Sequence, residues 1–437
     1  MWWYHKLNAV LEKLMQYVWQ HRLWVSQSMF TVDGRKVQVI DPGRLNTDAG
    51  PDFFNAKVKI DGEMWVGNIE IHVRASDWLR HHHDKDAAYD SVILHVVEKD
   101  DMPVRRSNGE VIPQLCMPCS AQFSEQYNRL VGSAASELPC AQEIAKLPSI
   151  YLTDMISTLG YERLYSKVER IEQLLNRFSG DWNEVCYVLL ARSLGFGVNS
   201  DAFERLALAT PLKFMSKHSD SLTVIEAMLF GQSGLLDNAP DDSYVATLKE
   251  EYRFFAQKFG LVQPSSLGWK MARMRPQNFP HRRIAVLAAM IEGGFGYASK
   301  MMSAKSVDEV RQLFEVELSG YWTQHSSFKS AGGGSKRGLR ESSISILIIN
   351  AVIPVIYAYG RLCNDETACN RAIEMLQSLK PEKNSIVELF MRAGIECKDA
   401  FTSQALIQLR REYCETRKCL YCRIGHRMLA LRARKQG

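Results

Sequence analysis

Several signatures that would assign this chain to a common class of protein are absent. The 437 residues contain no dinucleotide fingerprint, no phosphate-loop order of glycines and lysine, and no Gly-x-Ser-x-Gly elbow, which excludes those nucleotide-binding and serine-hydrolase sites. No internal repeat is present, which argues against a solenoid. The opening residues, Met1-Trp2-Trp3-Tyr4-His5-Lys6, have no apolar core before a cleavage site, so we expect no signal peptide.

Long apolar runs are also scarce. The best candidate, residues 344–359, is shorter than the roughly 20 residues of a membrane-spanning helix. It also contains Asn350 and Pro354, so a buried helix is the better interpretation and we expect no membrane contact. Ten cysteines without a secretion signal predict reduced thiols and metal ligands rather than disulfides, and the cytoplasm as the compartment.

Length and hydropathy pattern predict three segments, because 437 residues exceed what one hydrophobic core usually holds. Residues 1–118 read as a small α/β domain: a helix over 2–24, hairpins turning at Asp33-Gly34 and Asp61-Gly62, a short helix or loop over 76–86, and strands over 92–97 and 111–116. Residues 119–330 read as a helical domain and residues 331–437 as a C-terminal helical segment. The predicted fold class is therefore α+β, a small α/β domain followed by a large all-helical region.

The helices of the second and third segments are expected from apolar spacing. They cover residues 122–130, 161–178, 182–194, 221–235, 242–259, 280–292 and 307–316, with a last helical block from residue 342 onward. The run Ala331-Gly332-Gly333-Gly334-Ser335-Lys336 interrupts this pattern. It is predicted to be a flexible connector.

Two acidic residues in the first segment are the main functional signal. Asp52 follows Gly50-Pro51 at the start of a predicted strand, and Glu70 and His72 lie on the next strand. Side chains alternate between the faces of a strand, so Glu70 and His72 point the same way. Two carboxylates on adjacent strands can hold Mg²⁺ or Mn²⁺ and leave room for water and a phosphate oxygen. Asp52 and Glu70 are therefore candidate metal ligands.

The order helix, strands, helix, strand, with Pro51-Asp52 opening one strand and Glu70-x-His72 on the next, resembles the PD-(D/E)XK nuclease superfamily over roughly residues 1–118. The resemblance implies a restriction-endonuclease-like domain in which Asp52 and Glu70 bind Mg²⁺ and a phosphodiester of DNA or RNA is hydrolysed. His72 stands where that superfamily has a lysine. Because histidine titrates near neutral pH, His72 either orients or deprotonates water or binds the metal. Alternatively, the exchange marks a scaffold that binds nucleic acid without cleaving it.

A longer stretch of this segment resembles a second family. Residues 46–53, 65–72, 77–81 and 94–97 are similar to a bacterial family known only as a domain of unknown function (2851). The likeness spans most of the chain and implies a shared architecture. It implies no particular activity.

Five of the eleven histidines lie between residues 72 and 95. Neutral imidazoles and carboxylates are ligands for Zn²⁺ and Mn²⁺, so His81, His83 and Asp86 are candidates to complete the metal site. A zinc hydrolase that acts on a substrate other than nucleic acid is then an alternative function. If the histidines bind no metal, they form a solvated polar loop. Glu12 on the first helix could add a third carboxylate, although a surface glutamate is the simpler interpretation.

The C-terminal region carries a second candidate metal site. Cys414-x4-Cys419-x2-Cys422-x3-His426 supplies four ligands in a spacing typical of zinc knuckles. Zn²⁺ suits this Cys3His set best, and a [4Fe–4S] cluster is the alternative metal group. Thiols without a metal are the structural interpretation. Cys116-x2-Cys119, with Cys140 as a third ligand, is a weaker candidate because no fourth ligand is near.

Basic and aromatic residues interleave over residues 269–276 and 279–283. Arginine can contact phosphates and stack on bases, but a solvated helix flank with core aromatics explains this pattern more simply.

Four hypotheses about function remain. They are a divalent-metal-dependent nuclease using Asp52, Glu70 and His72, a catalytically inactive nucleic-acid-binding protein, a zinc hydrolase, and a structural interaction module.

Overall fold

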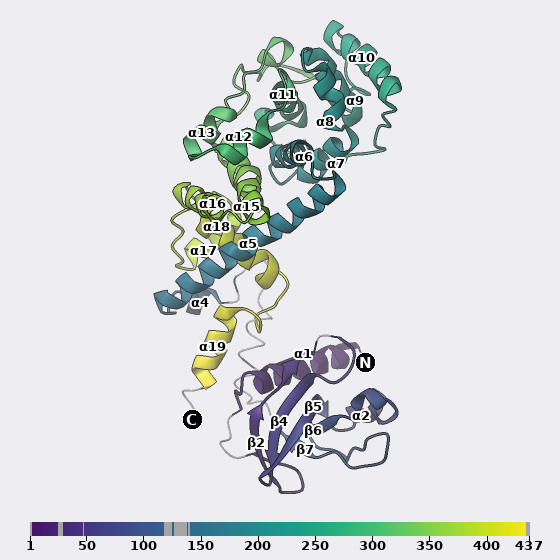
Figure 1. The fold of residues 1–437 in the computed structure, drawn as a ribbon, viewed down its shortest axis with the longest axis vertical. Coiled ribbons are helices and arrows are strands. Elements are labelled where there is room, and N and C mark those ends of the chain that lie inside the picture. The colour runs from purple at the N-terminus through teal and green to yellow at the C-terminus, as the bar shows by residue number, and fades with distance from the viewer. Residues whose placement is uncertain are drawn as a thin grey trace. The chain divides into compact units, whose positions relative to one another are not determined.

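The computed structural model describes residues 2–24, 29–46, 48–117, 125, 138 and 140–433. Packing divides the chain into two compact units, which Figure 1 shows as ribbons. The first consists of Met1–Met155, Arg392–Ile395 and Leu409–Gly437, and the second of Ile156–Met391 and Glu396–Gln408. The C-terminal residues therefore belong to the same unit as the N-terminal sheet. The three-segment division remains a prediction.

Within its described residues, the first unit contains a seven-stranded sheet in the order β1-β2-β4-β5-β6-β7, with β3 pairing on β4. The pairs from β1 to β5 are antiparallel, whereas β5, β6 and β7 are parallel. The strands are β1 (Met29–Phe30), β2 (Lys36–Asp41), β3 (Arg44–Leu45), β4 (Phe53–Ile60), β5 (Glu63–Arg74), β6 (Val92–Lys99) and β7 (Gln114–Cys116). This sheet confirms the strands expected in the N-terminal region.

The turn between β4 and β5 sets the register on which the candidate site depends. Asp61 and Gly62 have φ values of 52° and 88°, the positive values that a two-residue type I′ hairpin requires at both positions. The predicted turn thereby brings Ile60 opposite Glu63 and Phe53 opposite Ile69. As a result the start of β4 and the last part of β5 lie side by side.

The two faces of the sheet are covered differently. Helix α1 (Trp2–Gln20) packs on one face, where Ile69, Ile71 and Val96 join a core with Leu14 and Val18. The other face carries a smaller core that includes Trp78, Tyr89 and Val97, under three short helices. These are α2 (Asp77–Arg80), η1 (His83–Lys85) and η2 (Ala87–Tyr89). Strand β6 is buried on both faces over its first six residues, as its apolar sequence predicts.

The remaining described elements of the first unit are α4 (Ala141–Ile144), the first residues of α5 (Ser149–Arg177), the π-helical turn η7 (Leu409–Cys414) and α19 (Arg423–Ala433). The predicted helix over residues 122–130 lies outside the described residues, apart from residue 125.

The second unit is mostly helical, as predicted (Figure 1). Over the described chain, helix makes up about 53% and strand about 13%, which places the fold in a mixed α and β class with its main sheet near the N-terminus. The elements of this unit after α5 are α6 (Trp182–Leu194), α7 (Ser200–Ala209), α8 (Leu212–Met215), η3 (Ser216–His218), α9 (Leu222–Ser233), α10 (Ser243–Phe259), η4 (Pro276–Asn278), α11 (Pro280–Ile291), α12 (Tyr297–Ser303), α13 (Val307–Leu313), η5 (Gly320–Thr323), β8 (His325–Ser327), β9 (Ser330–Ala331), α14 (Glu341–Leu347), η6 (Ile348–Val352), α15 (Ile353–Leu362), α16 (Glu366–Ser378), α17 (Ser385–Arg392) and α18 (Ala400–Gln408).

Side-chain caps explain why several of these helices begin where they do. Asp181 accepts hydrogen bonds from the backbone N–H groups of Asn183 and Glu184 before α6, and Asp242 accepts one from Val245 before α10. Such caps satisfy N–H groups that have no partner within the helix.

One helical stretch, Glu341–Leu362, is long and apolar enough to cross a membrane by length and composition. However, 78% of its most apolar window is buried inside the molecule. Burial of this kind is typical of a core helix, and it supports the prediction that residues 344–359 form a buried helix.

The glycine-rich run after residue 330 is an ordered turn, so the prediction of a flexible connector is wrong. β8 and β9 pair, and a Cβ added to Gly334 would lie 2.4 Å from the backbone of Gln324. The side chain of Arg282, only 1% exposed, donates hydrogen bonds to the backbone oxygens of Trp322, Ser335 and Arg337. The glycines here allow close packing of the backbone, which composition alone does not distinguish from flexibility.

The same geometry corrects the interpretation of the basic and aromatic residues at the start of α11. His281, Arg282 and Arg283 are all buried, and the guanidinium of Arg283 lies 4.4 Å from the ring centroid of Phe196. These three side chains therefore form part of the core of the second unit, and they are neither a solvated flank nor a surface for nucleic acid.

A buried carboxyl in this unit predicts a pH-dependent stability. Glu226 accepts hydrogen bonds from Trp322 Nε1 and Tyr244 Oη, and burial raises its pKa to about 7 from a usual value near 4.5. The folded state thus keeps this proton to higher pH than the unfolded chain, so the free energy of unfolding falls as pH rises from about 4.5 to about 7. We expect the loss between about pH 5 and pH 8 to be about 2 kcal/mol smaller in Glu226→Gln.

Urea unfolding of both proteins at the two pH values measures this difference. An equal loss in the wild type and in Glu226→Gln contradicts the assignment. The substitution keeps the side-chain length and an oxygen acceptor for Trp322, which limits other effects on packing.

Candidate metal centre

Asp52 and Glu70 meet at the start of β4. The backbone N–H of Asp52 donates to Oε2 of Glu70 at 3.1 Å, and the backbone N–H of Ile71 donates to Oδ2 of Asp52 at 3.0 Å. The carboxylate of Glu70 thus accepts a hydrogen bond from the backbone of Asp52. The carboxylate of Asp52 accepts one from Ile71, the residue that follows Glu70. The register of the hairpin therefore places two carboxylates side by side, although they are 18 positions apart in the sequence.

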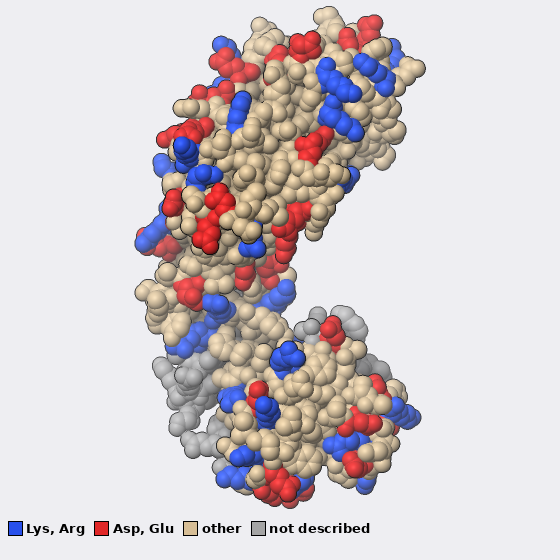
Figure 2. Space-filling model, in the orientation of Figure 1, with Lys and Arg blue, Asp and Glu red and all other residues tan. Residues whose placement is uncertain are grey.

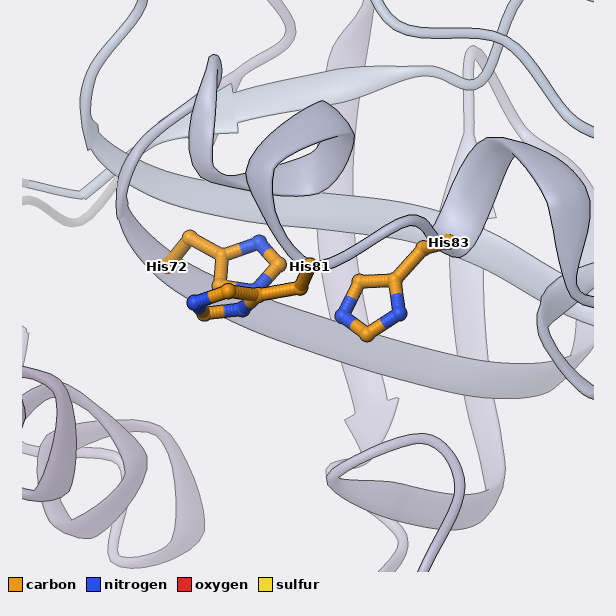
Figure 3. A group of neighbouring side chains, drawn as sticks. All are labelled: His72, His81 and His83. Atoms are coloured by element: carbon orange, nitrogen blue, oxygen red, sulfur yellow. The ribbon is translucent and has the colours of Figure 1, made fainter.

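Three histidines lie around Glu70, on the face of the sheet opposite α1. His72 lies on β5, His81 directly follows α2, and His83 begins η1 (Figure 3). Oε1 of Glu70 is 3.4 Å from His72 Nε2 and 3.3 Å from His83 Nε2. Nδ1 of His81 is 3.2 Å from His72 Nε2. The prediction that Glu70 and His72 point the same way is confirmed.

One nitrogen from each imidazole lies within 4.8 Å of one from each of the other two. His72 and His83 are buried, whereas His81 is exposed. The histidine group is therefore buried at His72 and His83 and open to solvent at His81. Three convergent imidazole nitrogens beside a carboxylate oxygen are a ligand set for a transition metal such as Zn²⁺ or Mn²⁺.

The second ring nitrogen of His72 is hydrogen-bonded to His95 on β6, with His72 Nδ1 and His95 Nε2 2.9 Å apart. A histidine that binds a metal usually has its second ring nitrogen fixed by a hydrogen bond of this kind. His95 is fully buried, and among the described residues its Nδ1 has no hydrogen-bond partner. Two aromatic rings also pack beside the histidines. Trp78 contacts Tyr89, and Tyr89 stacks on His83 with ring centroids 3.7 Å apart.

Burial dominates the electrostatics of the site. It raises the pKa of Asp52 to about 7, with a further contribution from the charge of Glu70. It also raises the pKa of Glu70 to about 8, to which the charge of Glu12 adds. The pKa of Glu12 itself rises to about 7 through burial and the charges of Asp52 and Asp77. Three carboxyl groups therefore repel one another when ionised, and a cation between them would relieve that repulsion.

The histidines shift in the opposite direction. Burial lowers the pKa of His72 well below its usual value and that of His95 to about 3. The pKa values of His81 and His83 are also lowered, again mainly by burial. A lowered pKa favours the neutral imidazole, which has the lone pair that a metal ion or a proton requires.

The structure places the remaining predicted residue of this site differently. Asp86 is exposed, and its Oδ1 accepts a hydrogen bond from the backbone N–H of Ala88. That contact makes Asp86 the cap of η2, and it does not belong to the histidine group. Its role as a metal ligand remains a prediction.

Two residues of α1 also belong to the site. The sequence indicated one of them, Glu12, only weakly and the other, Gln16, not at all. Gln16 donates from Nε2 to Oδ1 of Asp52 at 2.9 Å. Glu12, one helical turn earlier, interacts electrostatically with Asp52 and Glu70. The i, i+4 spacing of two polar residues on the sheet-facing helix was the available signal.

The C-terminal ligands predicted as a Cys3His knuckle are also within the first unit. Cys414 and Cys419 are buried, and Cys422 is half-buried. Nδ1 of His426 is hydrogen-bonded to the hydroxyl of Tyr17. Cys119, proposed with Cys116 as part of a weaker site, lies outside the described residues.

Comparison with known proteins identifies a family. A family model described as "Protein of unknown function (DUF2851)" matches residues 12–385. No curated protein and no solved structure matches the chain. The matched range includes Asp52, Glu70 and the three histidines of the site.

Proposed function

This chain belongs to the DUF2851 family of proteins of unknown function, and we propose that it is a divalent-metal-dependent phosphodiesterase acting on DNA or RNA. The observation that carries the proposal is that the backbone of Asp52 donates to Glu70 and the backbone of Ile71 donates to Asp52, beside a group of three histidines. Carboxylates brought together at the mouth of two strands suit metal-assisted hydrolysis, because a bound divalent ion polarises a phosphate and lowers the pKa of water.

Each residue has a definable task in this proposal. Asp52 and Glu70 hold the cation, and Gln16 and the backbone of Ile71 orient the carboxylate of Asp52. His72 and His83 contribute nitrogens from the buried side. His81 is exposed, and burial lowers its pKa, which favours the neutral imidazole that can accept a proton from an attacking water.

Arg80 supplies a positive charge beside the site. Its Nη2 is 2.9 Å from Oδ1 of Asp77, and its charge lowers the pKa values of both Glu12 and His72. A guanidinium in this position can form paired hydrogen bonds with phosphate oxygens. On the face shown in Figure 2, basic and acidic side chains are otherwise interspersed over the described surface. Because Arg80 lies beside the metal centre, we expect it to contact a phosphate of the substrate there.

The ligand set predicts which metal supports the reaction. Mg²⁺ prefers oxygen ligands, whereas imidazole nitrogens favour Mn²⁺ or Zn²⁺. We expect cleavage of labelled DNA or RNA to be faster with Mn²⁺ than with Mg²⁺ and to stop when the metal is chelated. A steady-state assay of the full chain, stripped of metal and then titrated with each ion, measures this. Turnover that persists in excess chelator contradicts a metal-dependent mechanism.

A zinc hydrolase acting on a substrate other than nucleic acid is the second candidate. It is favoured by the convergence of three imidazoles within 4.8 Å, the number of histidine ligands found in some zinc enzymes. Two results distinguish it from the first: hydrolysis of ester or amide substrates with Zn²⁺, and no cleavage of DNA or RNA with any of the three ions.

A nucleic-acid-binding protein without turnover is a further alternative, because His72 stands where the resembled nuclease motif has a lysine. It predicts binding that weakens as salt increases and no cleavage product. In all three cases we propose the reducing cytoplasm as the compartment, in keeping with the free thiols of the described cysteines.

A further inference from the structure

Part of the sheet face that carries the candidate metal centre is exposed. Alternate side chains along β5 share a face, so the face of Glu70 and His72 also carries Met64, Val66 and Asn68. Helix α1 packs on the opposite face (Figure 1). Whereas Glu70 and His72 are buried, Met64 is 51% exposed and Val66 is 59% exposed. The site therefore continues along β5 into an exposed surface.

Strand β4 adds two lysines to this surface. Lys57 lies directly opposite Val66, and Lys59 lies directly opposite Met64, and residues paired in this way share a face of the sheet. Val58, between the two lysines, is fully buried in the core under α1, which fixes both lysines on the other side. Lys57 is exposed and Lys59 is half-buried.

Strands β2 and β1 extend the surface to the edge of the sheet. Gln38 on β2 lies opposite Lys59. Two residues earlier on the same strand, Lys36 is exposed and lies opposite Phe30 of β1, which is 51% exposed. We call this surface the open sheet face, and its members are Phe30, Lys36, Lys57, Lys59, Met64 and Val66.

The cations of the open sheet face lie on the surface itself, whereas the neighbouring acids are engaged in turns. Asp41 lies opposite Lys57, and its Oδ1 accepts a hydrogen bond from the backbone N–H of Gly43 at 2.9 Å. Asp61, in the turn between β4 and β5, accepts one from the backbone N–H of Lys36 at 2.8 Å. Three lysines against two bordering acids leave the face positive, which favours a polyanion.

We propose that the open sheet face binds single-stranded DNA or RNA and leads it to the metal centre. This inference rests on the proposed function, because it names the substrate class of that same site. The lysines contact phosphates, and Phe30, Met64 and Val66 contact the faces of unpaired bases. A duplex keeps those faces stacked inside the helix, so its bases would leave the exposed apolar side chains without a partner. The mixture of apolar and basic residues therefore favours a single strand.

The geometry of β5 sets the path of the bound strand. At about 3.3 Å per residue, Val66 lies roughly 13 Å and Met64 roughly 20 Å along the strand from Glu70. Arg80 lies beside the metal centre. A nucleic acid laid along β5 therefore reaches the lysines on one side of the phosphate to be cleaved, and it meets Arg80 at the metal centre.

Fluorescence anisotropy of the full chain with labelled oligonucleotides tests the proposal apart from cleavage, because excess chelator prevents turnover. We expect a single strand of about 12 nucleotides to bind about tenfold more tightly than a duplex of the same length. Its binding should weaken as salt increases. Equal or tighter binding of the duplex overturns the proposal of a single-stranded substrate.

Variants of the open sheet face locate the binding. The double variant Lys57→Gln, Lys59→Gln should raise the Kd for the single strand about tenfold and reduce the slope of log K against log salt by about 1.4, because two phosphate contacts are lost. Phe30→Ala should raise the Kd about tenfold through lost stacking. Lys57→Arg with Lys59→Arg keeps both charges and should retain the affinity. Lys305→Gln, at an exposed position of the second unit, is the control for loss of a surface charge.

Photo-cross-linking of a single strand that carries 4-thiouridine gives a second readout, which needs no variant. The cross-linked peptides should contain residues 29–38 or 57–66. Cross-links confined to other segments, or an unchanged Kd in the glutamine double variant, overturn the proposal even if the wild type cleaves nucleic acid. Variants that change the oligomeric state and leave the Kd unchanged overturn it in favour of a protein interface.

The same measurements separate this inference from the proposed function. Binding that depends on Phe30, Lys57 and Lys59, in a protein that cleaves no nucleic acid with any metal, supports the open sheet face and contradicts the phosphodiesterase. Cleavage that requires Asp52 and Glu70, with binding that does not depend on the open sheet face, gives the opposite result.

Discussion

Replacing Asp52 by asparagine should lower kcat of the metal-dependent cleavage by about 10²–10³-fold. Asparagine has nearly the same shape, and its amide oxygen still accepts a hydrogen bond from the backbone of Ile71 or from Gln16, the two donors to Asp52. What it removes is the negative charge that holds the cation. Glu70→Gln should have an effect of similar size for the same reason.

The same substitution should not destabilise the metal-free protein. Burial and the charge of Glu70 raise the pKa of Asp52 to about 7, so the ionised pair is unfavourable when no cation is present. We expect the Tm of metal-free Asp52→Asn to equal or exceed that of metal-free wild type. Loss of activity together with unchanged or raised stability distinguishes a functional carboxylate from a structural one.

Asp48→Asn is the matched control, because Asp48 is exposed on the loop that leads into β4. It should retain wild-type kcat and Tm. If Asp52→Asn and Glu70→Gln cleave at the wild-type rate, the reaction does not use this site.

The largest effect on stability is expected at Arg282. Its guanidinium is buried and donates to three backbone oxygens, those of Trp322, Ser335 and Arg337. Arg282→Met removes all three donors and leaves buried acceptors without partners, so we expect the free energy of unfolding to fall by about 4 kcal/mol.

Chemical denaturation monitored by circular dichroism measures this loss. Arg253→Met, at an exposed position of α10, provides the control and should change stability by less than about 0.5 kcal/mol. A similar small change at Arg282 would mean that the turn over residues 331–337 does not depend on this side chain.

The sequence predicts the candidate site well where local rules apply. The Asp61-Gly62 turn determines the pairing of β4 and β5, and strand alternation places Glu70 and His72 on one face. Together these two rules bring Asp52, Glu70 and His72 to one place. His83 and His81 follow because only a short segment links them to β5.

Local rules do not reach the contacts between distant segments. Glu12 and Gln16 join the site because α1 packs against the sheet. The apolar periodicity of α1 predicts that one face of the helix is buried, but it does not predict which residues that face contacts. Cys140 packs against the core that contains Cys419, whereas sequence spacing groups it with Cys116. Glycine is ambiguous in principle, since the run after residue 330 has the same composition whether it is flexible or closely packed.

The most direct test of the central claim is to locate a metal ion in the site. Crystals of the full chain soaked in Mn²⁺ and measured for anomalous scattering should show a peak bounded by Asp52, Glu70 and the imidazoles of His72 and His83, at about 2.0–2.3 Å from its ligands. The peak should be absent from crystals of Asp52→Asn treated in the same way. An anomalous map with no peak between these side chains, at a Mn²⁺ concentration that saturates activity, would contradict the account.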